Sequence, residues 1–191
     1  MSKVLIAYFS HSGKSRKASQ LIAETVGGDL YEIKTVREYP KDEDKCIDVA
    51  RVEFNAKVRP ELAGDLPDIS GYEKIVIGFP CWHDTCPMGV LTFLEEYDFT
   101  GKTVYPFMTH EGSGPDGCNE DMKASCKNGD VKAAIDGNGF FVGRKIFVQP
   151  FGKESYCVMY IDTCPDTTNF KLLKFGSNLF CLLTVVFKTL G

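Results

Sequence analysis

Short apolar runs alternate with segments of helical periodicity along the first two thirds of the chain. Residues 4–9, 74–79 and 103–108 form almost continuous apolar runs, and residues 30–33 form a shorter one. Runs of this kind are typical of strands that are buried on both faces. Helical spacing marks the intervening segments, at residues 18–26, 42–58, 87–94 and 119–127. Strands that alternate with helices predict an α/β fold, with a parallel sheet covered by helices on both faces.

The helix predicted at residues 42–58 has acidic residues at its start and a proline just after its end. Its apolar residues recur at helical spacing, at Ile47, Ala50, Phe54 and Val58. This stripe predicts the side of the helix that faces the core.

Composition narrows the class of protein. The chain has 191 residues, of which 43% are hydrophobic, enough for one domain or one domain with an appendage. A net charge of −4 and the lack of a long basic run argue against a general nucleic-acid binder.

The eight cysteines show no C-x-x-C spacing, so neither a zinc ribbon nor a dithiol motif is indicated, and we predict no metal site. Most of these cysteines are expected to be small buried apolar residues. The sequence begins MSKVLIAYFS, which we interpret as a first strand and not as a signal peptide. A cytoplasmic location with reduced thiols is the resulting expectation.

The pattern changes from residue 145 onward. The segment NLFCLLTVVFKTL, residues 178–190, is strongly apolar but too short to span a bilayer as a helix. A buried helix or strand is favoured over a membrane or partner contact. We therefore predict one domain over residues 1–144 and an atypical C-terminal segment over 145–191 that packs on the same domain.

The loop after the first strand reads SHSGKS, residues 10–15, and a helix follows it directly. Lys14, Arg16 and Lys17 lie where a helix already carries partial positive charge, which suggests an anionic ligand. A nucleoside triphosphate and a flavin phosphate are the two ligands considered. The first is disfavoured because a Walker A motif needs glycine where this chain has Tyr8. A loop that binds nothing would leave three cations unexplained.

Two further loops follow the next two central strands. Residues 78–87, GFPCWHDTCP, contain Trp82, the only tryptophan of the chain, and residues 108–117, MTHEGSGPDG, are rich in glycine. Ligands of open α/β sheets bind at the carboxyl ends of the strands, so the three loops should lie on one rim. Trp82 would be a platform for a planar ring, or a core residue that caps the surface. His110 would be a donor to that ligand, or a solvated loop residue.

These segments resemble the flavodoxin-like family, above all the members with a Pro-x-Trp motif in the second loop. The matching pieces are LIAYFSHSGKSRKAS and YEKIVIGFPCWHDTCPMGVLTFLEEYDFTGKTVYPFMTHEGSG, and the likeness covers roughly residues 3–127. The resemblance implies a doubly wound, five-stranded parallel sheet of order 2-1-3-4-5 in three α/β/α layers. It also implies non-covalent FMN at the carboxyl edge. The fifth strand would be NGFFVGRKIF, residues 138–147.

The resemblance further implies three groups of FMN contacts. The phosphate would be held by Ser10, Ser12, Gly13, Lys14 and Ser15. The isoalloxazine would be flanked by Pro80, Cys81, Trp82, His83 and Asp84, with Trp82 stacked on it. The other side of the ring and its pyrimidine edge would be lined by Thr109, His110, Glu111, Gly112 and Gly114.

We predict a carrier that passes single electrons between a reductase and an acceptor, with FMN cycling through oxidised, semiquinone and hydroquinone states. Asp84 and Glu111 would disfavour the anionic hydroquinone. One alternative is an FMN-dependent NAD(P)H oxidoreductase acting on a quinone or nitro compound. Another is an interaction protein that kept the fold and lost FMN. The expected partners are redox proteins or a small quinone, with no nucleic acid and no membrane span.

Overall fold

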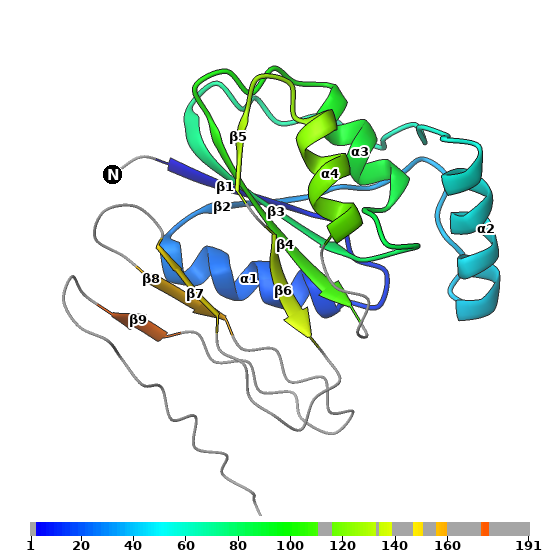
Figure 1. Cartoon of the computed structure of the whole chain (residues 1–191), viewed down its shortest axis with the longest axis horizontal. Coiled ribbons are helices and arrows are strands. Elements are labelled where there is room, and N and C mark those ends of the chain that lie inside the picture. Colours follow the sequence, from blue (N-terminus) through cyan, green and yellow to red (C-terminus); the bar gives the residue numbers. More distant parts are fainter. Residues whose placement is uncertain are drawn as a thin grey trace, which may run out of the picture.

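The structure is a computed structural model that describes residues 3–110, 116–132, 134–138, 147–150, 156–159 and 173–175. Its central sheet is parallel and has the strand order β2-β1-β3-β4-β5 (Figure 1). The strands in that order are β2 (Asp29–Glu32), β1 (Lys3–Tyr8), β3 (Tyr72–Pro80), β4 (Thr103–His110) and β5 (Asp130–Val131). The predicted fold class and strand order 2-1-3-4-5 are confirmed.

The fifth position of the sheet is filled by two short segments. β5 pairs with the start of β4, and β6 (Ile135–Asn138) pairs with its end, both in parallel. The strand predicted at residues 138–147 shares only Asn138 with these two segments, and residues 139–146 lie outside the described residues. The prediction followed the more apolar run, whereas a strand that starts soon after the preceding helix needs only a short connection.

Pro106 lies in β4 at the point where its partner changes from β5 to β6. The carbonyl of Val104 accepts a hydrogen bond of 2.9 Å from the Lys132 amide, so Val104 faces this edge. Residues two apart on a strand face the same side, so Pro106 faces it too. Neither β5 nor β6 pairs with residue 106, so the missing N–H of proline costs the sheet no hydrogen bond there.

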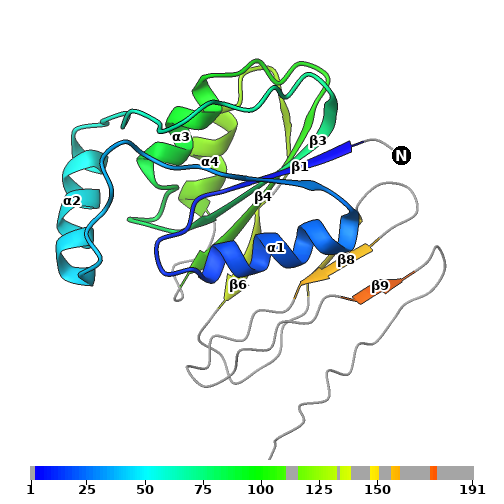
Figure 2. The ribbon, with the colours of Figure 1, turned by 180° about the vertical axis from the view of Figure 1, so that it is seen from behind.

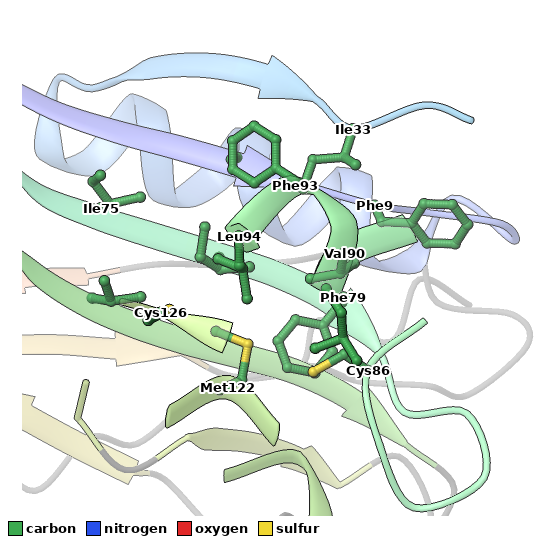
Figure 3. Packing of buried hydrophobic residues seen from close by; sticks show 14 of the residues in the cluster. Phe9, Ile33, Ile75, Phe79, Cys86, Val90, Phe93, Leu94, Met122 and Cys126 are labelled. Carbon is green, nitrogen blue, oxygen red and sulfur yellow. The ribbon is translucent and has the colours of Figure 1, made fainter. Parts of the chain in front are cut away.

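Helices cover the two faces of the sheet in the predicted three layers (Figures 1 and 2). On one face lies α1 (Lys14–Val26), whose Ala18 and Ile22 pack with Ile6 and Phe107. The opposite face carries α3 (Met88–Glu95) and α4 (Asp116–Ser125) over a larger cluster. Figure 3 shows members of this cluster from the sheet and both helices.

The predicted inward face of α2 (Glu43–Asn55) is correct for Ala50 and wrong for the larger apolar residues. Its buried residues are Cys46 and Ala50, whereas Ile47 and Phe54 are 44% and 39% exposed. α2 lies at the edge of the molecule, apart from the sheet (Figure 1), so its larger apolar side chains are not covered by the sheet. Its start is as predicted, because the Asp42 side chain caps the Lys45 amide at 3.1 Å.

Three short strands lie within the C-terminal segment. β7 (Phe147–Pro150), β8 (Tyr156–Met159) and β9 (Leu173–Phe175) form an antiparallel sheet in the order β7-β8-β9. The apolar run at residues 178–190 lies outside the described residues. The domain boundary at residue 144, and the packing of the segment on the domain, stay predictions.

Within the part of the chain that the structure describes, no helix is both long enough and apolar enough to cross a membrane.

Candidate cofactor-binding site

The three predicted loops follow β1, β3 and β4 and lie at one edge of the sheet. The ladder continues into them, since the Phe9 amide donates to the Gly78 carbonyl at 2.8 Å. In the same way, the Cys81 amide donates to the Thr109 carbonyl at 2.8 Å. The loops are therefore neighbours on one rim, as the sequence predicts.

The first loop ends in an uncapped helix start. Gly13 stands at the N-cap of α1 with φ 87°, and no side chain caps the helix there. This left-handed conformation favours glycine. The first helical hydrogen bond joins the Lys17 amide to the Gly13 carbonyl at 3.1 Å. Because the first turn of α1 contains no acidic residue, the positive end of the helix lacks a local carboxylate and fits an anion.

The predicted phosphate contacts occupy different depths in this loop. Ser12 and Lys14 are exposed, whereas Ser10 and Gly13 are half-buried. The Ser10 hydroxyl accepts a hydrogen bond from the Gly13 amide at 3.1 Å, which shapes the turn. Ser15 is buried, and its hydroxyl bonds with that of Thr109 at 3.1 Å. The Ser15 side chain therefore links the first loop to the third.

Arg16, one of the three cations, has a carboxylate partner within the protein. Arg16 forms an ion pair and a hydrogen bond with Glu32 at the end of β2. Burial alone would raise the pKa of Glu32, but hydrogen bonds from Arg16 and Lys34 outweigh it, so the pKa is lowered. The prediction that all three cations serve an anionic ligand is therefore wrong for Arg16, whose charge is paired with Glu32.

The second loop closes as a tight two-residue turn. The backbones of Trp82 and Thr85 exchange hydrogen bonds of 2.9 and 3.1 Å. Between them, His83 and Asp84 have φ of 52° and 61°, as a type I′ turn requires. Non-glycine residues in this region carry strain, which is often found at functional sites. The turn is anchored on α4, because the Thr85 hydroxyl donates to the Asp121 carboxylate.

Trp82 is held in an aromatic cluster that sequence reasoning missed. Its ring packs edge-to-face against Phe9 and Tyr39, with centroids 5.4 and 5.0 Å apart. The ring centroid of His11 lies 6.0 Å from that of Trp82. His11 also donates a hydrogen bond of 2.7 Å to the Pro40 carbonyl. Trp82 remains half-buried, so it caps the core and also presents a surface at the rim.

The Tyr39 hydroxyl donates a hydrogen bond of 2.6 Å to the Glu53 carboxylate, which connects the aromatic cluster to α2. Burial, with the nearby Glu53, raises the pKa of Tyr39. Phe54 also reaches the rim and stacks on His83, with ring centroids 5.9 Å apart. Tyr39 comes from the segment before α2 and Phe54 from α2 itself, and no local sequence pattern signals that they contact the second loop.

The third loop is described at its beginning. Thr109 and His110 end β4 and are each 7% exposed, so the interpretation of His110 as a solvated loop residue is wrong. Pro80 ends β3 and is half-buried, and Asp84 is exposed. Glu111, Gly112 and Gly114 lie outside the described residues.

Comparison with known proteins identifies the family. Residues 3–140 match the model of the flavodoxin family, and the chain belongs to that family. A search of curated proteins finds no match.

Solved structures show the same architecture. A candidate flavoprotein from Bacteroides eggerthii is 33% identical with a TM-score of 0.65, over 71% of this chain and 88% of that chain. One from Bacteroides uniformis is also 33% identical, with a TM-score of 0.62, over 72% of this chain and 92% of that chain. A flavoprotein from Lactobacillus acidophilus, solved in complex with FMN, is 24% identical with a TM-score of 0.63. The match covers 71% of this chain and 93% of that chain. These likenesses confirm the flavodoxin-like fold.

Proposed function

We propose that this chain binds FMN non-covalently at the three loops and acts as an electron carrier. Membership in the flavodoxin family supports FMN as the cofactor, and so does the FMN complex of the Lactobacillus acidophilus flavoprotein. The observation that carries the proposal is the contact between two loops of different character. His11, from the loop at the positive end of α1, approaches the half-buried ring of Trp82. A phosphate and a flat aromatic ring on one ligand would fit this pair of loops.

The residues of the first loop would hold the phosphate. The amides at the start of α1 would donate to it, with Ser10 and Ser12 as hydroxyl donors and Lys14 as a nearby charge. Ser15 would contribute its amide, because its hydroxyl is shared with Thr109.

The second and third loops would hold the ring. Trp82 would pack against it and exclude water, while Pro80, Cys81 and His83 flank it. Thr109 and His110 would lie along its other side, together with the proposed contacts Glu111, Gly112 and Gly114. The exposed carboxylate of Asp84 would disfavour added negative charge nearby. When bound, FMN supplies the redox chemistry, and the protein orients it and tunes its potential.

A visible absorption spectrum tests FMN binding directly. Purified chain is mixed with FMN, excess is removed, and flavin bands are expected to stay with the protein. Trp82→Ala should raise the Kd for FMN by about tenfold or more, and Trp82→Phe should raise it less, because stacking is partly kept.

A matched pair of charge variants tests the phosphate end of the site. Lys14→Ala is expected to weaken FMN binding, and Lys127→Ala, past the end of α4, is not. Failure of the wild-type chain to retain FMN would contradict the proposal and favour an interaction protein that has lost its cofactor.

Stepwise anaerobic reduction separates a carrier from a two-electron enzyme. A carrier is expected to take up electrons in two separated one-electron steps. Steady consumption of NAD(P)H with a quinone, and without an added reductase, would contradict the carrier role.

A further inference from the structure

Three cysteine thiols meet beside the aromatic turn. Cys81 follows the end of β3, Cys86 follows the turn, and Cys118 lies in the first turn of α4. The sulfur of Cys118 lies 3.7 Å from that of Cys81, although they are 37 positions apart in sequence. Cys86 is close enough to Cys118 to raise the pKa of its thiol. In the described part of the chain, no cluster of potential ligands has the geometry to hold a metal ion.

We propose that Cys81 and Cys118 are a redox-active pair that closes a reversible disulfide by exchange with a low-molecular-weight disulfide. A disulfide bond measures about 2.05 Å, so the two sulfurs must approach by about 1.7 Å. Side-chain rotation can supply a shift of this size. Pairs of this kind in a reducing compartment are typically transient and redox-sensing.

Burial assigns the order of the two steps. Among the five cysteines whose side chains are described, Cys81 is half-buried and the others are buried. An external disulfide therefore reaches Cys81 first. Contact with Cys81 lowers the pKa of Cys118, but the neighbouring Cys86 and burial outweigh it, so the pKa is raised. A buried thiol with a raised pKa reacts slowly with external reagents, so Cys118 acts second, on the neighbouring Cys81 sulfur.

The exchange balances without a further reactant. The Cys81 sulfur loses its proton and attacks one sulfur of the external disulfide, which releases one thiol and leaves a mixed disulfide. The Cys118 sulfur then loses its proton and attacks the Cys81 sulfur, which releases the second thiol. Two cysteine thiols are oxidised to one disulfide, and one external disulfide is reduced to two thiols.

Closure of the bond would tie the aromatic turn to α4. Cys81 directly precedes Trp82, whose backbone closes the turn with Thr85. Because Trp82 is the only tryptophan, its fluorescence reports on the change without any bound cofactor.

The test uses the full chain without added FMN, so its outcome does not depend on the proposed function. The protein is incubated with excess glutathione disulfide, its free thiols are alkylated, and it is digested without reduction. Trypsin alone leaves Cys81 and Cys86 in one peptide, so chymotrypsin is added to cleave after Trp82. Mass spectrometry then identifies which cysteines are joined.

The expected product joins Cys81 to Cys118, with a mass loss of about 2 Da, and dithiothreitol reverses it. Trp82 fluorescence should change on oxidation in the wild type and in Cys46→Ser and Cys86→Ser, and not in Cys81→Ser or Cys118→Ser. A stable glutathione adduct on Cys81, or a bond from either cysteine to another partner, would overturn the proposal. The wild-type map decides the question even where a variant does not fold.

Discussion

Gly117 lies where α4 packs closely against the aromatic turn. A Cβ atom added there would lie 2.1 Å from the carbonyl oxygen of Asp84, which belongs to the backbone and cannot swing away. We expect Gly117→Ala to push the turn from α4 and to lower the free energy of unfolding by about 1–3 kcal/mol.

Gly71→Ala is the matched control, because its added Cβ would meet nothing within 4 Å. This change should stay within about 0.5 kcal/mol of the wild type. Urea unfolding followed by Trp82 fluorescence measures both variants. Equal stabilities for the two variants would show that the turn yields without cost.

At the scale of single residues, the sequence predicted where the site lies better than it predicted how its side chains interact. The loops and Trp82 could be located because strand ends mark the ligand-binding edge of an open sheet. The Ser15–Thr109 hydrogen bond and the Arg16–Glu32 ion pair each join a residue of α1 to the end of a strand that is distant in sequence. Such contacts depend on register and rotamers, which local spacing does not encode.

At the scale of elements, Glu95 joins three segments at the end of α3. Its carboxylate accepts two hydrogen bonds of 2.8 Å from Arg59, which follows α2, and one of 3.1 Å from Ser125, which ends α4. The hydrogen bonds with Arg59 are the main reason that the pKa of Glu95 is lowered. An acid whose pKa is lowered by folding stabilises the native state at any pH above its unfolded-state pKa. This stabilisation is lost as the pH falls through the pKa that the acid has in the folded protein.

We expect Glu95→Gln to cost about 0.5–1 kcal/mol at pH 7, a small effect because both partners are partly exposed. The difference from the wild type should shrink as the pH falls below about 4. Glu24→Gln, an exposed carboxylate on α1, is the control and should change little. Unfolding curves between pH 3 and 7 measure the effect, and a constant difference over that range would contradict it.

The elements that the sequence predicted well are those buried on both sides. β1, β3 and β4 are continuous apolar runs because helices cover both faces of the sheet. The two differences from the prediction lie at the margin of the fold. α2 presents Cys46 and Ala50 inward instead of its larger apolar residues, and β5 and β6 are short and less apolar than the run that follows. Edge elements bury less, so hydrophobic pattern constrains them less.

At the scale of the whole molecule, the family match ends at residue 140. The compared flavoproteins cover 71% to 72% of this chain, although 88% to 93% of each of those chains is covered. The family therefore accounts for the parallel sheet and its helices. That residues 145–191 pack on the same domain stays a prediction.

The net charge of −4 leads to a prediction about partners that rests on the proposed carrier role. An acidic carrier should associate faster with a basic redox protein at low salt, because opposite charges steer the encounter. Raising the ionic strength from about 0.01 M to 1 M shortens the Debye length from about 30 Å to about 3 Å. We therefore expect electron transfer from the reduced protein to a basic haem protein to slow by about tenfold over this range.

A neutral quinone offered to the same reduced protein provides the control, because its encounter gains nothing from charge. Its rate should stay nearly constant as salt rises. Stopped-flow traces of both reactions, on one preparation and with the same salt series, give the comparison. If the haem protein is also reduced at a rate independent of salt, charge does not guide docking. Reduction of the quinone much faster than of the haem protein at every salt concentration would then favour a small-molecule reductase.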